Sequence, residues 1–238
     1  AGVDDAGNAV LGTLYQPVTS IMRQGALATE ILIASEDMTL KPEGMSFETA
    51  AALGVPGQTA CGAFRALDLR AGDVIVISAA AGGVGSLATQ LAVHRGATVI
   101  GIASDANADY VRSLGAIPVA YGEGLVDRVR AAAPTPVTKL LDCYGSEYIT
   151  LGFSLGLSRK AIGTLVPGPK AAFRGVHITG MRHAHPASDL AEIASLVADG
   201  TITIDIAHEY PFDIDSVRAA YTQLMGGHVR GKLVVKLQ

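Results

Sequence analysis

A cluster of glycines lies in the middle of DVIVISAAAGGVGSLATQLAVHRGATVIGIAS, which covers residues 73–104. The order is a β-branched run, then AAGGVG at residues 80–85, then a helical pattern; this is G-x-G-x-x-G with alanine in the first slot. Gly82 would let the backbone approach a pyrophosphate, and Gly85 would let the helix pack closely on the strand. A tight turn is the alternative, but the strand–helix–strand context favours a phosphate cradle at the helix N-terminus.

The end of the next strand bears on which dinucleotide such a cradle would hold. An NAD site usually places Asp or Glu about 20 residues after the glycines, to hold the ribose 2′-hydroxyl. This strand ends at Ala103 and Ser104 without a carboxylate, and Ser104 and Asn107 could donate to a 2′-phosphate. Asn107 could instead cap the following helix, and Asp105 could be a displaced ribose ligand. The pattern favours NADP, with NAD left open by Asp105.

Other constellations carry weaker signals. His183 and His185 could ligate a metal, but no third ligand lies nearby in sequence, so a solvated loop is the better interpretation. None of the seven tyrosines has Lys four residues on, which argues against a short-chain dehydrogenase. Ser78 and Ser86 have no G-x-S-x-G setting, which argues against an acyl hydrolase. Cys143 follows a strand and could contact a cofactor, without a nucleophilic role.

Composition narrows the class of protein. Of the 238 residues, 49% are hydrophobic and 17% are charged, which is ample apolar material for a core. The net charge of −4 offers no basic field for nucleic acid. Two cysteines, no apolar run long enough to span a bilayer and no signal-peptide layout predict a cytoplasmic protein without a membrane partner.

These residues need a scaffold of alternating strands and helices. Strand-like runs occur at residues 74–78, 97–103, 117–121, 138–143, 163–167 and 176–181, with helical patterns at 83–94, 106–115 and 125–133. This alternation predicts an α/β fold with a doubly wound parallel sheet covered on both faces. The flanks differ: residues 25–34 alternate like a strand, a helix is expected near 216–225, and 232–237 reads as a final strand. Both ends are therefore expected to form a second, β-rich part.

Three segments carry a family likeness. They are LKPEGMSFETAAALGVPGQTACGAFRAL at 40–67, RAGDVIVISAAAGGVGSLATQLA at 70–92 and GGHVRGKLVVKL at 226–237. Together they resemble the medium-chain dehydrogenase/reductase superfamily, in particular its zinc-independent quinone oxidoreductase and enoyl reductase branch. The resemblance implies a Rossmann domain at 43–182 that carries NADPH. It also implies a reduced GroES-like domain from 1–42 and 183–238, and hydride transfer to an α,β-unsaturated carbonyl or a quinone.

The resemblance also implies site residues. Thr59 and Tyr144 would be candidate catalytic residues beside the nicotinamide. The residues expected to bind the cofactor are Gly82, Gly83, Val84, Gly85, Ser104, Asn107, Tyr121, Cys143, Val166, Pro167 and Lys232. Among these, the glycine loop would hold the pyrophosphate, Tyr121 would lie against the adenosine, and the loops around 143 and 166 would border the nicotinamide.

No metal is expected in this site. Zinc alcohol dehydrogenases of the superfamily place a ligand cysteine four residues before the threonine, where this chain has Val55. Their four-cysteine structural lobe would fall within residues 1–40, which contain no cysteine. Without a Lewis acid to polarise an alcohol or ketone, a conjugated acceptor is favoured.

The resemblance leaves two functions open. Family members carry a longer N-terminal part that contributes to the substrate site, so this chain is expected to be a shortened form. It is then either a reductase of a small-molecule substrate, or an NADPH-binding protein or non-redox biosynthetic catalyst, such as a cyclase, that has lost hydride chemistry. The strand at 176–181 is expected to pair across a two-fold axis and give a homodimer.

Overall fold

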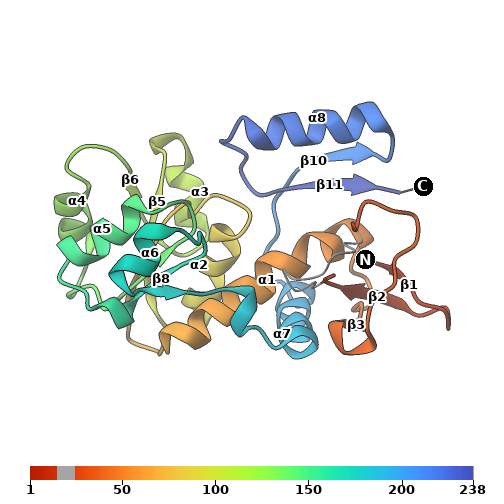
Figure 1. Cartoon of the computed structure of the whole chain (residues 1–238), viewed down its shortest axis with the longest axis horizontal. Coiled ribbons are helices and arrows are strands. Elements are labelled where there is room, and N and C mark those ends of the chain that lie inside the picture. The colour runs from red at the N-terminus through yellow and green to blue at the C-terminus, as the bar shows by residue number, and fades with distance from the viewer. Residues whose placement is uncertain (15–24, 238) are drawn as a thin grey trace. The chain divides into compact units, whose positions relative to one another are not determined.

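The computed structural model describes residues 1–14 and 25–237 of the chain (Figure 1). It divides into two compact units, one made of Ala1–Val55 with His185–Gln238 and the other of Pro56–Ala184. No helix within the described residues is both long and apolar enough to cross a lipid bilayer.

Helix α1 (Phe47–Leu67) runs from one unit into the other. The units divide within α1, which is continuous through Pro56, and again after residue 184. The Rossmann domain expected at 43–182 and the GroES-like domain expected from 1–42 and 183–238 stay predictions.

The unit Pro56–Ala184 is built on a six-stranded sheet in the order β6-β5-β4-β7-β8-β9. All neighbouring strands are parallel. The strands are β4 (Val74–Ile77), β5 (Thr98–Ala103), β6 (Ile117–Ala120), β7 (Lys139–Asp142), β8 (Ile162–Thr164) and β9 (His177–Ile178). The chain moves outward from β4 to β6 and then restarts at β7 on the other side of β4. This reversal makes a switch point between β4 and β7, where ligands of open α/β sheets bind.

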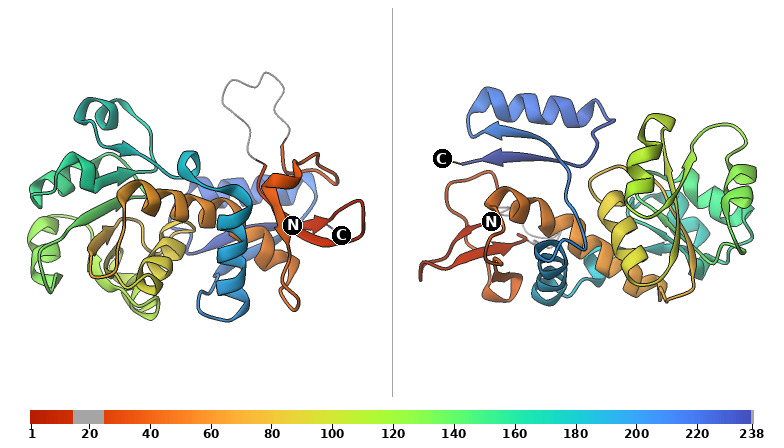
Figure 2. Two further views of the ribbon diagram at one scale, coloured as in Figure 1. Left: turned by 90° about the horizontal axis from the view of Figure 1, so that it is seen from below. Right: turned by 180° about the vertical axis from the view of Figure 1, so that it is seen from behind.

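Helices surround this sheet (Figure 2). They are the second half of α1, then α2 (Gly85–His94), α3 (Ala108–Ser113), α4 (Leu125–Ala132), α5 (Glu147–Ser154) and α6 (Pro169–Arg174), with short 3₁₀ turns η2 (Asp105–Asn107), η3 (Arg159–Ala161) and η4 (Met181–His183). All four residues of β4 are buried, and side chains alternate between the two faces of a strand, so both faces are covered. The predicted doubly wound α/β sheet is confirmed.

The other unit contains two small sheets. Strands β1 (Gly2–Val3), β2 (Ala9–Gly12) and β3 (Met38–Leu40) form an antiparallel sheet that follows the order β1-β2-β3. Helix α7 (Pro186–Ala198) lies against β3 and the 3₁₀ turn η1 (Ser35–Asp37). Strands β10 (Ile206–Pro211) and β11 (Lys232–Lys236) form a parallel pair joined through α8 (Ile214–Met225).

The expectations for these flanks fare differently. The final strand and the helix near 216–225 are confirmed as β11 and α8; α8 begins earlier because the Asp213 carboxylate accepts hydrogen bonds from the N–H groups of Asp215 and Ser216 at 3.0 and 2.9 Å. The strand expected at 25–34 is wrong. Those residues form bends and irregular chain, since their alternation meets no partner strand among the described residues.

Candidate functional site

The glycine loop joins β4 to α2 by a sharp turn. Ala79 adopts a left-handed conformation with φ of +49°, and its carbonyl oxygen accepts a hydrogen bond from the N–H of Gly82 at 2.9 Å. Gly85 is buried, and a Cβ there would overlap that oxygen and lie 2.7 Å from the Ala79 carbonyl carbon. At Gly82 a Cβ would lie 3.3 Å from the same oxygen. The loop is thus folded so closely that Gly85 leaves no room for a side chain.

The geometry of this loop fits a bound pyrophosphate. In the part of the chain that the structure describes, the N–H groups of Gly83 and Val84 have no hydrogen-bond acceptor, and both residues are partly exposed. They directly precede the first turn of α2, where backbone N–H groups and the helix dipole favour an anion.

A buried carboxylate lies beside the loop at the switch point. Asp142 ends β7 and is fully buried, and its Oδ1 accepts hydrogen bonds from Ser78 Oγ at 3.0 Å and from the N–H groups of Tyr144 and Gly145 at 3.0 and 2.9 Å. Its Oδ2 accepts a bond from Thr164 Oγ1 at 2.8 Å. The carboxylate therefore joins the ends of strands β4, β7 and β8.

No sequence motif predicted the hydrogen bonds between Asp142, Ser78 and Thr164. The only trace of them in the sequence is that each is a single polar residue at or just after the end of an apolar strand. Ser78 and Asp142 are 64 positions apart, so no local spacing relates them. Only the parallel pairing of β4, β7 and β8 brings them together.

Ser104 and Asn107 lie together after β5. The Asn107 Nδ2 donates to Ser104 Oγ at 3.1 Å, and the Asn107 N–H donates to the Ser104 carbonyl at 2.9 Å. Asn107 is the N-cap residue of α3, but its side chain makes no capping hydrogen bond. Its amide instead orients the Ser104 hydroxyl, while Asp105 between them is exposed.

Two exposed tyrosines follow the next strand ends. Tyr121 comes directly after β6 and is 53% exposed; Tyr144, in the loop after β7, is 66% exposed. The Tyr144 ring meets the buried Tyr148 ring edge-on, with centroids 6.1 Å apart. Burial, and after it the nearby Glu147 charge, raise the pKa of Tyr148 to about 12, so this phenol keeps its proton at neutral pH.

Thr59 and the loop after β8 both lie beside Gly180. A Cβ on Gly180 would lie 3.2 Å from Thr59 Cγ2 and 3.1 Å from Leu165 Cδ2. The loop continues into Val166 and Pro167, which are exposed, and the Val166 N–H donates to Thr164 Oγ1 at 3.1 Å.

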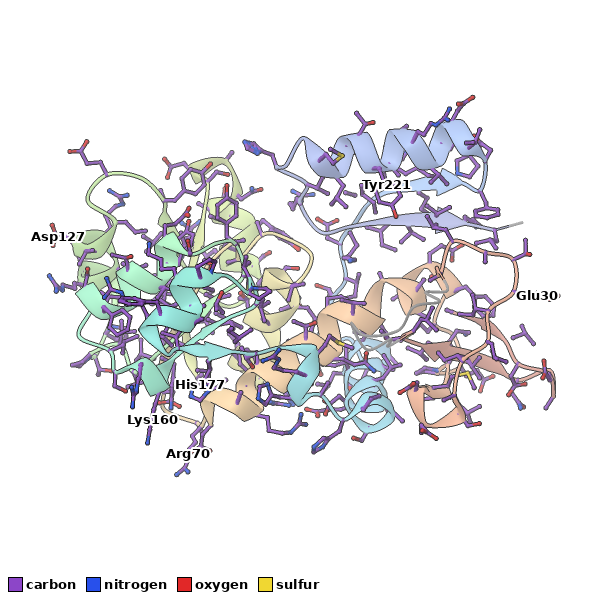
Figure 3. The ribbon with its side chains drawn as sticks, viewed as in Figure 1. Glu30, Arg70, Asp127, Lys160, His177 and Tyr221 are labelled. Atoms are coloured by element: carbon purple, nitrogen blue, oxygen red, sulfur yellow. The ribbon has the colours of Figure 1, made fainter. Side chains whose placement is uncertain are left out.

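The predicted site residues of this unit fall largely at one edge of the sheet. The loops that carry the glycines, Ser104, Tyr121, Tyr144 and Val166 follow β4, β5, β6, β7 and β8, and carboxyl ends of parallel strands meet at one edge. Three basic side chains labelled in Figure 3, those of Arg70, Lys160 and His177, lie instead at the amino ends of β4, β8 and β9.

Lys232 belongs to the other unit, where it begins β11. Its N–H donates to the Asp205 carbonyl at 2.8 Å, and burial lowers the pKa of its ammonium group. Its expected role toward a cofactor stays a prediction.

Cys143 is expected to react slowly with alkylating agents. Burial, and secondly the Asp142 charge, raise the pKa of its thiol above the ordinary value, so less thiolate is present near pH 8. Iodoacetamide labelling followed by mass spectrometry should modify Cys143 far more slowly in the native protein than in urea. Labelling at equal rates in both states would show that the thiolate is accessible and would contradict this expectation.

Comparisons with known proteins agree with this architecture. A family model described as zinc-binding dehydrogenase matches residues 114–235, about half of the chain. The bovine protein named NAD(P)H oxidoreductase RTN4IP1, mitochondrial (Bos taurus), is 29% identical over 247 residues, covering 90% of this chain and 62% of that protein. The chloroplastic NADPH-dependent alkenal/one oxidoreductase of Arabidopsis thaliana is 27% identical, covering 89% of this chain and 53% of its own length.

Solved structures are similar as well. The quinone oxidoreductase from Coxiella burnetii superposes with a TM-score of 0.73 at 31% identity, covering 86% of this chain and 65% of that one. An NAD-dependent alcohol dehydrogenase gives a TM-score of 0.76 at 24% identity, a likeness of fold. This chain thus spans less than two thirds of the length of these relatives.

Proposed function

The chain belongs to the medium-chain dehydrogenase/reductase superfamily, and from this premise we propose that it binds NADPH and takes part in the metal-independent reduction of an α,β-unsaturated carbonyl or a quinone. The names of the similar proteins, which include an alkenal/one oxidoreductase and a quinone oxidoreductase, support this choice of acceptor.

The observation that carries the proposal is the glycine loop at the switch point. Its N–H groups at Gly83 and Val84 are available to phosphate oxygens, and Gly85 allows the turn that presents them. Every helix leaves its first N–H groups unpaired, and the position of this loop at the switch point of the sheet is what favours a phosphate here.

The remaining loops supply contacts along the rest of a dinucleotide. Exposed Tyr121 offers a ring face for the adenosine, and the loops at Tyr144 and Val166 offer backbone and apolar contacts to the nicotinamide half. When bound, the reduced nicotinamide supplies a hydride. The work of this chain's residues is to orient that ring and a planar acceptor against each other, which lowers the entropic cost of reaction.

The choice of NADPH rests on the end of β5. The Ser104 hydroxyl accepts from the Asn107 amide and keeps its own proton to donate, which suits a 2′-phosphate better than a ribose diol. Independence of zinc rests on residue types: Val55 stands where zinc enzymes have a cysteine, and two cysteines cannot build a four-cysteine lobe.

Thermal unfolding with NADPH, NADH or no ligand tests the proposal. NADPH at roughly 100 times its dissociation constant should add about 2.7 kcal/mol to the free energy of unfolding and raise Tm by several degrees. NADH should raise it less, because it lacks the 2′-phosphate. Equal shifts would contradict the role of Ser104, and no shift with either nucleotide would contradict the proposed function itself.

A further inference from the structure

We infer that Asp142 is a positioning residue. Its single buried carboxylate fixes the glycine loop after β4 and the two loops after β7 and β8, which carry Tyr144 and Val166. The inference rests on the proposed function for its consequence, and on the hydrogen bonds of Asp142 for its geometry.

The first set of hydrogen bonds, which we call the first arm, joins Asp142 through Ser78 to the glycine loop. Ser78 Oγ donates to Asp142 Oδ1 at 3.0 Å and accepts from the Cys143 N–H at 2.8 Å, so its hydroxyl is held in one orientation. Ser78 directly precedes Ala79, whose left-handed conformation turns its carbonyl toward Gly82. A non-glycine residue is strained in that region, so the turn needs an anchor, and Ser78 provides it.

The second arm runs to the loops after β7 and β8. The N–H groups of Tyr144 and Gly145 turn inward onto Asp142 Oδ1, which leaves the Tyr144 ring facing outward. On the other oxygen, Thr164 Oγ1 donates to Oδ2, and the same hydroxyl accepts from the Val166 N–H. The loop at Val166 is thereby tied to the carboxylate through one intermediate hydroxyl.

The chemistry of these partners explains why an acid occupies this place. All four direct partners of Asp142 are donors, namely two hydroxyls and two backbone N–H groups. Only a carboxylate accepts from all four at once, and its charge strengthens each bond. Removing it leaves buried donors unpaired, which the loops can relieve only by moving.

The test compares Asp142→Ala and Asp142→Asn with Thr138→Val as a matched control. Thr138 Oγ1 donates to Asp73 Oδ1 at 2.7 Å and accepts from the Val74 N–H at 3.1 Å, so it joins the same two strands at their amino ends. Its loss disturbs the β4–β7 pairing away from the candidate site.

Hydrogen exchange without cofactor gives the first readout. The informative amides are those of Gly82, Ser86 and Val166, because they bond to Ala79, Gly82 and Thr164 and make no bond to Asp142 itself. Asp142→Ala should speed their exchange, Asp142→Asn should do so less, since its amide oxygen still accepts, and Thr138→Val should leave them unchanged. Unchanged exchange at Gly82 and Val166 in Asp142→Ala would overturn the inference.

Titration of NADPH by fluorescence gives the second readout. Asp142→Ala should weaken binding by about ten-fold or more, with partial rescue in Asp142→Asn and little change in Thr138→Val. Equal losses in Asp142→Ala and Thr138→Val would overturn the positioning role. If the unaltered protein binds no NADPH, the proposed function fails, while the exchange data still decide whether Asp142 fixes the loops.

Should Asp142→Ala fail to fold, Ser78→Ala and Thr164→Val each remove one arm. Ser78→Ala should speed exchange of the Gly82 amide and leave the Val166 amide unchanged. Thr164→Val removes the acceptor of the Val166 N–H directly, so its informative amide is that of Gly82, which should be unchanged. Unchanged exchange at Gly82 in Ser78→Ala, or faster exchange at Gly82 in Thr164→Val, would overturn the arrangement.

Discussion

Replacing Gly85 with alanine is expected to abolish the proposed binding of NADPH and to lower the free energy of unfolding by about 3 kcal/mol or more. The added Cβ would overlap the carbonyl oxygen of Ala79 and lie 3.1 Å from the Ala80 Cα. These are backbone atoms, so no side chain can move aside to make room. The loop must open, and the N–H groups of Gly83 and Val84 then lose their arrangement. Chemical denaturation and an NADPH titration measure the two effects.

Substitutions at two further glycines are expected to change NADPH affinity and the free energy of unfolding separately. At Gly82 a Cβ meets the Ala79 oxygen at 3.3 Å, which needs only a small adjustment, so Gly82→Ala should fold normally and bind NADPH about ten-fold more weakly. At Gly152 a Cβ would lie 2.7 Å from Ile162 Cδ1 in the core, so Gly152→Ala should lose stability and keep its affinity. If each of the two single variants, Gly82→Ala and Gly85→Ala, bound NADPH with unchanged affinity, the loop would not hold the phosphate.

The sheet was predictable because its signal is local. Each buried strand of the unit Pro56–Ala184, such as Val74–Ile77, is a short apolar run bounded by turn residues. Because these strands alternate with helices along the chain, they are expected to pair in parallel. The glycine loop was predictable for the same reason, since strand, glycines and helix are contiguous.

The Asp142 network was not predictable, because its partners come from three strands that meet only in the folded sheet. The strand wrongly expected at 25–34 shows the opposite error: an alternating pattern is necessary for a half-buried strand, but only a partner strand supplies its hydrogen bonds. The mutual arrangement of Ser104 and Asn107 likewise depended on side-chain geometry that residue types alone do not specify.

The tail motif HVRGK carried much of the family likeness, and its glycine has a structural explanation. Gly231 is buried, has φ of +75°, and a Cβ there would overlap the carbonyl oxygen of Asp205 and lie 2.8 Å from its carbonyl carbon. The same carbonyl accepts the Lys232 N–H at 2.8 Å, and the Asp205 carboxylate pairs with Arg230 at 2.7 Å. The motif thus holds the start of β11 against Asp205, the residue directly before β10.

Gly231→Ala should therefore lower the free energy of unfolding by about 3 kcal/mol or more, from left-handed strain and the backbone overlap together. Gly227→Ala is the matched control: Gly227 has φ of +70°, but a Cβ there would have no neighbouring atom within 4 Å, so this change should cost only the strain of about 1–2 kcal/mol. Urea denaturation of both variants separates the two contributions. Equal losses would mean that Asp205 does not approach Gly231 closely, and the tail motif would then have to be explained by its side chains.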